Sequence, residues 1–509
     1  MEFRLKKLLI ILPLLYLTAC TSSQPEVSKG PPNIVFIFAD DLTYEAVHAL
    51  GNNEIRTPNL DKLVALGTTF SHAYNMGGWN GAICVASRSM IISGRSVWNA
   101  NKFRQHWLQG EELDKTWGKL MEQNGYNTYM TGKWHVDAGA EQVFQNVVHI
   151  RPGMPRDEWG RLSMGQRFKE IEGTDAKLSS VMPVGYNRPL SEQDTSWSPT
   201  DPKFGGFWEG GKHWSEVLKD DAIEFINDAQ AKEQPFFMYL AFNAPHDPRQ
   251  APQEYLDMYP VEEIGLPKNW LPEYPYKDSI GCSPKLRDEA LAPFPRTEYA
   301  TIKHIQEYYA ITTHLDHQVG LIMDALEKSG RMDNTYIFFT ADHGLAIGSH
   351  GLLGKQSLYD HSIRVPFMIT GPDIPEGKTI KEDIYLQDVM ATSLELAGIE
   401  KPDYVEFNSL LGLIDGEQNE STYPSIYGGY IDLQRMIRKN GYKLIVYPRL
   451  EQVLLFDLSN DPQEMNDLAG DAQYQSKIKE LFDGLLQLQV KLNDELDLKP
   501  LHQKITTQS

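Results

Sequence analysis

Three apolar segments, far apart in the sequence, follow one plan and each leads into polar residues. They are Ile34 to Ala39 before Asp40 and Asp41, Pro235 to Phe242 before His246, and Tyr336 to Thr340 before Asp342 and His343. Because apolar and polar residues do not alternate within them, the segments are typical of strands buried on both faces, as in parallel sheets. Ligands of open α/β sheets bind beyond the carboxyl ends of the strands, so we expect these polar side chains to meet at one edge.

Segments with helical periodicity lie between these strands. Pro58 to Leu66, Glu216 to Ala229 and Tyr299 to Leu326 carry apolar residues at helical spacing. The alternation predicts an α/β domain, over residues 33–411, with a large, mostly parallel sheet between helices. From residue 412 to 509 the pattern changes to short alternating strands and an amphipathic helix, which predicts a smaller α+β subdomain built on a short antiparallel sheet.

The N-terminal sequence is typical of an export signal. Its apolar run, Leu8 to Leu17, follows basic residues and is too short to span a bilayer. The next residues, through Cys20, resemble a bacterial lipoprotein signal, with an ordinary cleaved signal as the alternative. We therefore expect a signal peptide over residues 1–19, a tether over residues 20–32 lipidated at Cys20, and a location in the periplasm or on the outer-membrane surface, held by the lipid.

The composition limits the partners and the source of stability. The chain has 48 basic and 69 acidic residues, a net charge of −21, which disfavours nucleic acid. An anionic substrate would need a local cluster of cations within this repelling field. Three isolated cysteines, Cys20, Cys84 and Cys282, provide no disulfide framework, so stability must come from the core.

A spaced signature around Cys84 indicates chemistry. The cysteine follows a glycine-rich approach, and Ser87-Arg88 and Gly94-Arg95 come after it at fixed spacing. The run after Cys84 can begin a helix, and a reactive group there would meet free backbone N–H groups and bound anions. The alternative is a buried cysteine ahead of a core helix.

Together the motifs resemble the formylglycine-dependent sulfatases of the alkaline phosphatase-like superfamily, in particular bacterial lipoprotein polysaccharide sulfatases. The motifs occur in the family's order: Asn33-Ile34-Val35, Asp40-Asp41, Thr57 to Asp61, Cys84 to Arg95, Gly132 to His135, Ala244-Pro245-His246, Asp342-His343-Gly344, His350 to Lys355, Arg364-Val365-Pro366, and Leu455 to Leu458 with Asp461 to Glu464. The resemblance implies an alkaline phosphatase-like fold and a sulfuric ester hydrolase.

The resemblance also implies that Cys84 is a precursor. A maturation enzyme would oxidise it to formylglycine (3-oxoalanine), whose hydrate would attack sulfur with one hydroxyl and expel sulfate with the other. Ala86 stands where the commonest form of the signature has proline, a variant that also occurs in bacterial sulfatases. This departure leaves open which maturation enzyme acts on Cys84.

The acidic residues predict a metal ion. Asp40, Asp41 and Asp342 would repel one another unless a cation neutralised them, and oxygen-rich ligand sets favour Ca²⁺. By resemblance one Ca²⁺ would bind them together with the modified Cys84 and His343. Many relatives have asparagine at position 343, and a histidine nitrogen is a less usual ligand for Ca²⁺.

The remaining site residues carry positive charge or protons. By motif, Arg88 would orient formylglycine, and Lys133 and Lys355 would bind sulfate oxygens. His135 would assist elimination, and His246 would contact the substrate and protonate the leaving alcohol, although the sequence leaves these two roles open. Four further residues of familiar segments are expected to orient loops or support structure: Arg95, His350, His361 and Arg364.

Export, long aromatic loops over residues 150–213 and 247–297, and the resemblance favour a sulfated polysaccharide or its oligosaccharides, algal in preference, over an aryl or choline sulfate. The aromatic segments Phe204 to Trp208 and Lys212 to Trp214 could face a sugar, with buried packing as the alternative. Two other functions stay open. One is a phosphonate monoester or phosphodiester hydrolase using the same site, and the other is an inactive glycan-binding surface lipoprotein.

Overall fold

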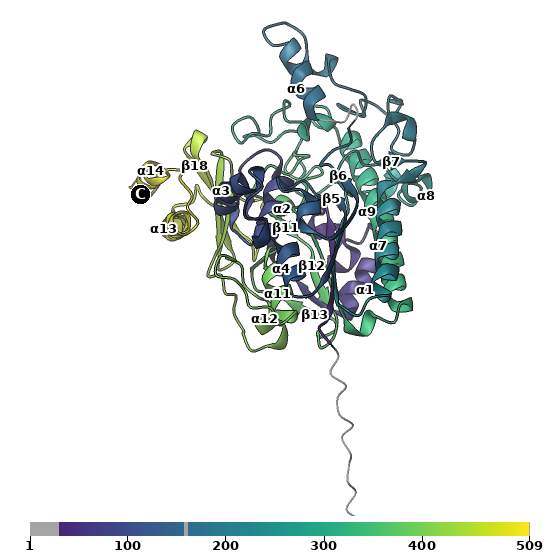
Figure 1. Ribbon diagram of the computed structural model, residues 1–509. Coiled ribbons are helices and arrows are strands. Elements are labelled where there is room, and N and C mark those ends of the chain that lie inside the picture. The colour runs from purple at the N-terminus through teal and green to yellow at the C-terminus, as the bar shows by residue number, and fades with distance from the viewer. Residues whose placement is uncertain (1–29, 157–160, 508–509) are drawn as a thin grey trace, which may run out of the picture. The chain divides into compact units, whose positions relative to one another are not determined.

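The computed structural model describes residues 30–156 and 161–507 (Figure 1). The predicted signal peptide, the predicted lipidation site Cys20 and the predicted tether up to residue 29 lie outside the described residues. Residues from Pro31 onward form one compact unit. Within the described part of the chain, no helix combines the length and apolar character needed to cross a bilayer.

An eight-stranded sheet forms the centre of this unit. In spatial order its strands are β13 (Lys378–Ile380), β2 (Thr68–Phe70), β12 (Phe367–Thr370), β10 (Thr335–Ala341), β1 (Asn33–Ala39), β9 (Phe236–Ala241), β5 (Asn127–Lys133) and β6 (Asn146–Arg151). All neighbours pair in parallel except β12, which is antiparallel to both of its neighbours. The predicted mostly parallel sheet is confirmed.

The three apolar segments form adjacent central strands, with β1 between β10 and β9. Ile34 of β1 pairs with Tyr336 on one side and with Phe237 on the other. This register brings the three strand ends, and the polar residues that follow them, to the same edge of the sheet. Every residue of β1 is buried, as the apolar run predicts.

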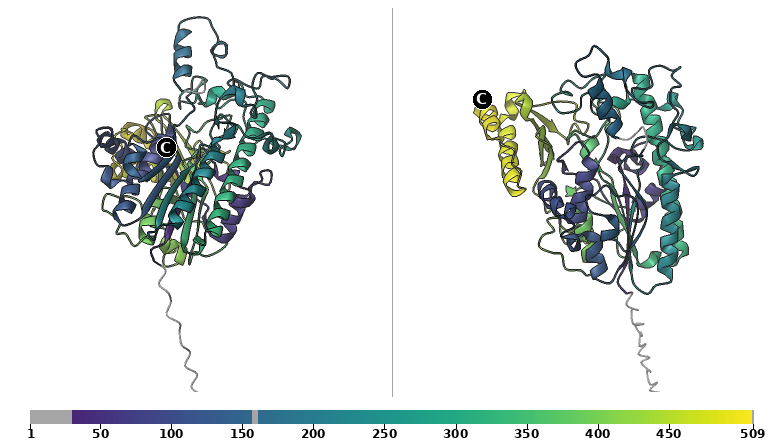
Figure 2. Two further views of the ribbon diagram at one scale, coloured as in Figure 1. Left: turned by 45° about the vertical axis from the view of Figure 1, so that its right-hand side comes forward. Right: turned by 45° about the horizontal axis from the view of Figure 1, so that its top comes forward.

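Helices cover both faces of the sheet (Figures 1 and 2). One face carries α1 (Pro58–Leu66), α7 (Trp214–Gln230) and α9 (Glu298–Lys328), and the other carries α2 (Ile83–Ser93), α4 (Trp117–Gln123) and α11 (Asp388–Leu396). The three predicted helices correspond to α1, α7 and α9, of which α1 has the predicted bounds and the other two extend slightly further. Other helices of this part of the chain are α3 (Val97–Leu108), α5 (Ala140–Val143), α8 (Gln253–Leu256), α10 (Asp360–Ile363) and α12 (Leu411–Asp415).

The C-terminal residues form a second sheet, which is antiparallel apart from one short edge strand. Its order is β18 (Gln452–Asp457), β17 (Tyr442–Tyr447), β16 (Gln434–Lys439), β15 (Ile426–Tyr430) and β4 (Gly77–Gly78), and α13 (Gln475–Lys491) and α14 (Lys499–Thr507) follow it. The edge strand β4 belongs to the approach to Cys84. A Cβ at Gly77 would lie 2.1 Å from the carbonyl oxygen of Gly429, so only glycine permits this pairing. The C-terminal sheet therefore supports the segment that leads to Cys84.

The two long aromatic segments are mostly irregular. They contain α6 (Arg161–Glu170), which projects from the top of the view in Figure 1, and the hairpin of β7 (Trp208–Glu209) and β8 (Lys212–His213). Phe207 is buried and packs on Trp214 with ring centroids 5.0 Å apart. Trp197 is buried under the guanidinium of Arg188. These aromatic rings contribute to packing. A third small sheet has the order β11 (Arg364–Val365), β3 (Ala73–Tyr74) and β14 (Ile384–Tyr385).

Candidate active site

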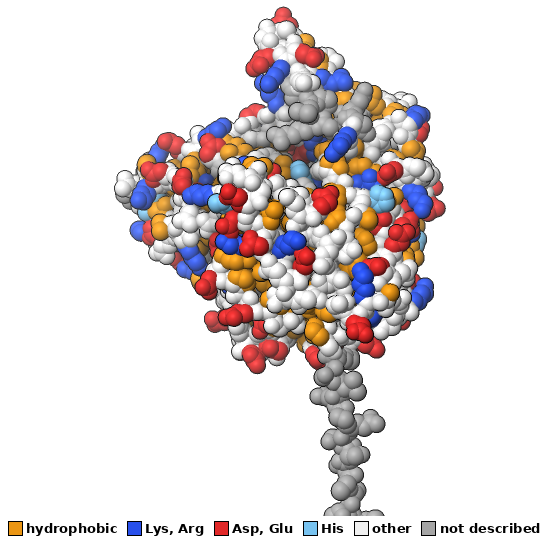
Figure 3. All heavy atoms as spheres, viewed as in Figure 1, with side chains coloured by type: hydrophobic (Ala, Val, Ile, Leu, Met, Phe, Trp, Pro, Cys, Tyr) orange, Lys and Arg blue, Asp and Glu red, His pale blue; other side chains and the backbone are white. Residues whose placement is uncertain are grey.

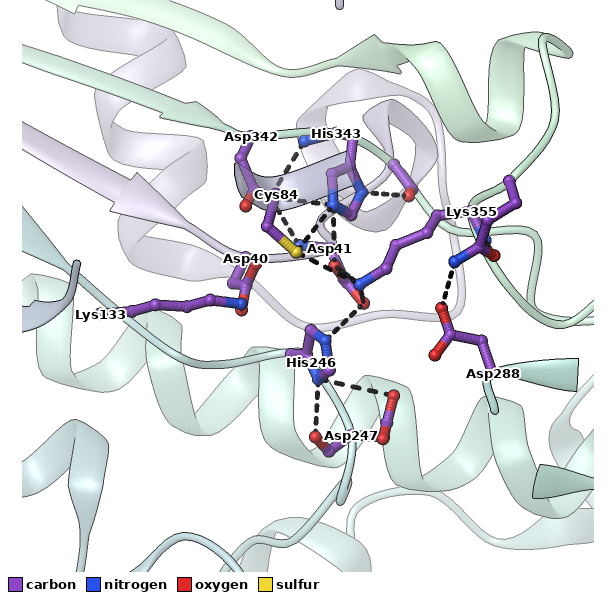
Figure 4. A network of polar contacts seen from close by, with 12 residues as sticks. Asp40, Asp41, Cys84, Lys133, His246, Asp247, Asp288, Asp342, His343 and Lys355 are labelled. Carbon is purple, nitrogen blue, oxygen red and sulfur yellow. Dashed lines mark hydrogen bonds and ion pairs between the residues drawn. The ribbon is translucent and has the colours of Figure 1, made fainter. Parts of the chain in front are cut away.

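Cys84 lies in the first turn of α2 and is 1% exposed. The helix ends at Ser93, and its C-cap residue Gly94 has a left-handed φ of 67°. The sulfur Sγ lies 3.4 Å from His343 Nε2 and 3.4 Å from Lys355 Nζ (Figure 4). Cys84 therefore faces cationic side chains from two distant segments.

The three predicted carboxylates meet beside Cys84. Asp40 and Asp41 follow β1, and Asp342 follows β10, so the parallel register places them together. Oδ1 of Asp342 accepts the backbone N–H of Asp41 at 3.1 Å and that of His343 at 3.0 Å. The two strand ends are thereby tied to each other through one carboxylate.

Arg88 and Lys133 neutralise two of these carboxylates. Arg88 of α2 lies with Nη2 3.1 Å from Asp342 Oδ2 and 3.5 Å from Asp40 Oδ1. Its Nη1 donates to the carbonyl oxygen of Lys133 at 2.9 Å, and the ammonium of Lys133 contacts Asp40. Burial raises the pKa of Asp40 to about 6, and the charge of Asp342 adds to that rise while Lys133 opposes it. All four side chains are fully buried, so each charge depends on these partners.

Asp41 is the meeting point of the other cationic residues. Its backbone is left-handed, with φ 67°, and its carboxylate receives Lys355 Nζ at 2.9 and 3.0 Å. His343 Nε2 lies 3.2 Å from Asp41 Oδ1, and His246 Nε2 lies 3.7 Å from Asp41 Oδ2. Burial alone would lower the pKa of His343, but the charges of Asp342 and Asp41 raise it to about 9.

The histidines differ in how their rings are held. His343 Nδ1–H donates to the carbonyl oxygen of Gly344 at 2.9 Å, and His246 Nδ1–H donates to that of Asp247 at 2.6 Å. In both rings Nε2 is therefore the nitrogen that faces the cluster. His135, at the end of β5, has a left-handed φ of 53° and its ring interacts with Cys84. Burial lowers the pKa of His135, and the interaction with Cys84 opposes this.

These charges act on the thiol. Burial would raise the pKa of Cys84, but Lys133, Lys355 and His343 hold it well below its ordinary value. The same concentration of cations would stabilise a bound anion. On the face shown in Figure 3, several basic and histidine side chains lie around a hollow below the segment that contains α6.

The structure adds residues that the sequence analysis missed. Asn75 Nδ2 donates to the carbonyl oxygen of Asp342 at 2.6 Å. Near His246 and Lys355 lie four further residues joined by polar contacts: Asp247, Arg287, Asp288 and Gln356. Asp247 and Gln356 directly follow His246 and Lys355 in the sequence, and this adjacency to predicted site residues could have identified them. Arg287 and Asp288 belong to an aperiodic loop and carry none.

Arg95 contacts helix α3, and the other residues of familiar segments contact loops. Arg95 stacks on Phe103 at 3.5 Å, and Arg364 Nε donates to the carbonyl oxygen of Ser71. The ring of His350 stacks on Tyr359 at 4.0 Å. His361 also stacks on Tyr359.

Comparison with known proteins gives the family. The family model described as "Sulfatase" matches residues 32–399. A second model, described as "N-sulphoglucosamine sulphohydrolase, C-terminal", matches residues 348–491. Together they cover every strand of the large sheet and of the C-terminal sheet, and α13.

Two curated relatives match over nearly their whole length. An arylsulfatase of Clostridium perfringens is 28% identical over 468 residues, which cover 88% of this chain and 92% of the relative. An N-acetylglucosamine-6-O-sulfatase of Bacteroides thetaiotaomicron is 26% identical over 561 residues, which cover 96% of this chain and 91% of the relative.

Two solved structures share the fold. One, a complex with its substrate D-glucosamine-2-N,6-O-disulfate, aligns with a TM-score of 0.69 at 23% identity and covers 92% of this chain and 100% of that chain. The other, a phosphonate monoester hydrolase of Silicibacter pomeroyi, aligns with a TM-score of 0.69 at 19% identity and covers 92% and 97%. With the family model matching across residues 32–399, the chain belongs to the sulfatase family and is a hydrolase of sulfate esters.

Proposed function

We propose that this enzyme hydrolyses sulfate esters of carbohydrates and that Cys84 is converted to formylglycine for this purpose. The observation that carries the proposal is the position of Cys84, buried at the start of α2 within 3.4 Å of Lys355 and His343. An ordinary structural cysteine has no need of buried cations. A relative that acts on N-acetylglucosamine supports a sugar as the esterified alcohol.

The donor set fits a divalent cation. Asp40, Asp41, Cys84 and His343 offer ligand atoms that all lie within 4.8 Å of one another. Carboxylate oxygens suit Ca²⁺, and the bond from His343 Nδ1–H to Gly344 leaves Nε2 facing the cluster, as a ligand must. We propose one Ca²⁺ held by this set and Asp342. When bound, the ion would polarise the sulfate group, and formylglycine would supply the nucleophilic oxygen.

The protein's own residues bind the anion and move the protons. Lys133 reaches the cluster beside Asp40, and Lys355 reaches it beside Asp41. Their ammonium groups would bind sulfate oxygens. Arg88 holds the carboxylates and the backbone of Lys133 in place. His246 would protonate the leaving alcohol from Nε2, because Nδ1 is bound to the backbone. His135, beside Cys84, would then receive a proton when sulfate is released.

The natural substrate we propose is a sulfated polysaccharide or its oligosaccharides, algal in preference. The long irregular segments after β6 and β9 support this, because loops over a rigid sheet are the usual place for specificity. We also propose that the protein is exported and anchored through a lipid on Cys20. That proposal rests on the sequence of the first 32 residues.

Cys84→Ala tests the proposed nucleophile. We expect sulfate release to fall at least about a thousandfold, because no other residue supplies the attacking group. Cys282→Ala, the same change at the other buried cysteine of the described chain, should retain activity. The substrates are N-acetylglucosamine 6-sulfate, sulfated algal oligosaccharides and 4-nitrophenyl sulfate, assayed by released sulfate. Mass spectrometry of the Cys84 peptide from the native host should show formylglycine.

The same assays separate the alternatives. Clearly greater efficiency on a phosphonate monoester than on any sulfate ester would contradict a sulfatase and favour the activity of the phosphonate hydrolase that shares the fold. An unmodified Cys84, together with no turnover of any ester, would instead indicate a glycan-binding protein without activity.

A further inference from the structure

Arg287 bridges two buried carboxylates beside the cluster. Its guanidinium contacts Asp247 through both Nη1 and Nη2, with Nη2 3.2 Å from Asp247 Oδ1, and Nη2 also contacts Asp288. The side chains of Asp247 and Asp288 are only 3% and 6% exposed, whereas that of Arg287 is 13% exposed. One planar cation therefore contacts two carboxylates that lie far apart within the segment 247–297.

The first carboxylate belongs to the residue that holds His246. The carbonyl oxygen of Asp247 accepts His246 Nδ1–H at 2.6 Å, and Asp247 Oδ1 lies 3.5 Å from the same nitrogen. The carboxylate thus lies between Arg287 and the imidazole. Without the guanidinium, the negative charge of the Asp247 carboxylate would be unpaired and would attract His246 Nδ1–H. The imidazole would then turn, and the direction of Nε2 would change.

The second carboxylate acts through Gln356. Asp288 Oδ2 accepts Gln356 Nε2–H at 2.7 Å, and the same amide nitrogen donates to the carbonyl oxygen of Gly81 at 2.9 Å. Oε1 of Gln356 accepts the backbone N–H of Lys355 at 3.0 Å. Asp288 therefore holds the amide that joins Lys355 to the segment entering Cys84.

We propose that Arg287 is a positioning residue for the sulfatase reaction, holding His246 through Asp247 and Lys355 through Asp288. The inference rests on the proposed function. When the nucleophilic oxygen supplied by residue 84 bonds to sulfur, the S–O bond to the alcohol would break. Its electron pair would stay on the alcohol oxygen, which would take the proton from His246 Nε2. A misdirected Nε2 slows this step most when the leaving alcohol is a weak acid, because a strongly acidic phenol departs without a proton.

The test compares Arg287→Met with Arg287→Lys. The methionine variant keeps much of the volume and removes the charge, whereas lysine restores one contact and one charge. Arg438→Met is the matched control. Arg438 lies in β16 of the C-terminal sheet, is also nearly buried, and pairs with Asp383 at 2.9 Å. The substrates are 4-nitrophenyl sulfate, phenyl sulfate and N-acetylglucosamine 6-sulfate, and kcat is normalised to the formylglycine content of each preparation.

For Arg287→Met we expect kcat on the sugar sulfate or phenyl sulfate to fall about a hundredfold or more, and at least tenfold further than on 4-nitrophenyl sulfate. KM should rise to a similar extent for all three esters, because Lys355 binds the sulfate group that they share. Arg287→Lys should recover part of both losses. Arg438→Met should lower thermal stability and leave the ratio between substrates unchanged.

A ratio that changes less than tenfold in Arg287→Met overturns the positioning role, whether all rates fall together or none does. A wild-type enzyme that releases sulfate neither from these three esters nor from sulfated algal oligosaccharides contradicts the proposed function itself, so the two failures are distinguishable.

Discussion

At the scale of single residues, the site is a nearly balanced set of buried charges. Arg88 pairs with Asp40 and Asp342, Lys133 pairs with Asp40, and Lys355 pairs with Asp41. Removing each of these ions from water costs roughly several kcal/mol, and only the contacts among the ions offset this cost. Such a cluster contributes little net stability. Its value is that the groups are already oriented for an anionic ester and a cation.

Substitution at His343 tests the proposed metal. We expect His343→Asn to bind Ca²⁺ more tightly than the wild type, because an amide oxygen suits this hard ion better than an imidazole nitrogen. Isothermal titration with Ca²⁺ after chelation measures the difference. His106→Asn, an exposed histidine far along α3, is the control and should leave the affinity unchanged. Weaker Ca²⁺ binding by His343→Asn would show that the ring nitrogen is the better ligand here.

At the scale of elements, contacts between helices replace local signals. The side chain of Thr57 does not cap α1; its hydroxyl accepts the backbone N–H of His48 at 2.8 Å and donates to Asp61. Instead Asp316 of α9 accepts the backbone N–H groups of Asn59 at 3.0 Å and Leu60 at 2.7 Å. The carboxylate of one helix thus caps the N-terminus of another, where the helix dipole favours negative charge.

Removing this cap should destabilise the protein. We expect Asp316→Ala to lower the free energy of unfolding by about 2 kcal/mol, since two backbone donors lose a buried partner. Denaturant unfolding followed by circular dichroism measures the change. Asp324→Ala, at an exposed position of the same helix, should change stability by less than about 0.5 kcal/mol. Equal losses in the two variants would contradict the capping role.

At the scale of the whole molecule, buried histidines distributed over the fold affect its response to acid. Burial lowers the pKa of His72 and of His350 to about 4. Burial also holds the pKa well below its usual value in three others, His213, His304 and His361. Below about pH 6.5 these histidines bind protons in the unfolded chain but stay neutral in the folded chain, because their pKa values are lower there. Their contribution to stability is therefore lost as the pH falls from about 6.5 towards 4.

His350 isolates this effect. Its Nε2–H donates to the carbonyl oxygen of Glu464 at 3.0 Å, an interaction that glutamine can imitate without titrating. We expect His350→Gln to be less stable than the wild type at pH 7, and the gap to shrink by on the order of 2 kcal/mol at pH 4.5. Urea unfolding at both pH values measures it. A gap that does not depend on pH would refute the assignment.

Much of this protein follows from its sequence alone. The unbroken apolar runs determined β1, β9 and β10, and apolar periodicity determined α1, α7 and α9, because burial of apolar surface is a local property of each segment. Since parallel strands end at one edge, the same runs also predicted that Asp41, His246 and Asp342 would lie together.

Tertiary structure alone decided the rest. β5, which ends at Lys133, has the mixed sequence Asn127–Lys133 and gave no strand signal, and its place beside β9 depends on pairing with a segment about a hundred residues away. The pairing of β4 with β15, and the bridge from Arg287 to Asp247 and Asp288, likewise join distant segments. Local periodicity indicates which face of a segment is buried, but not which distant residue that face contacts. The site depends on such contacts between distant segments, so only the tertiary structure could define it.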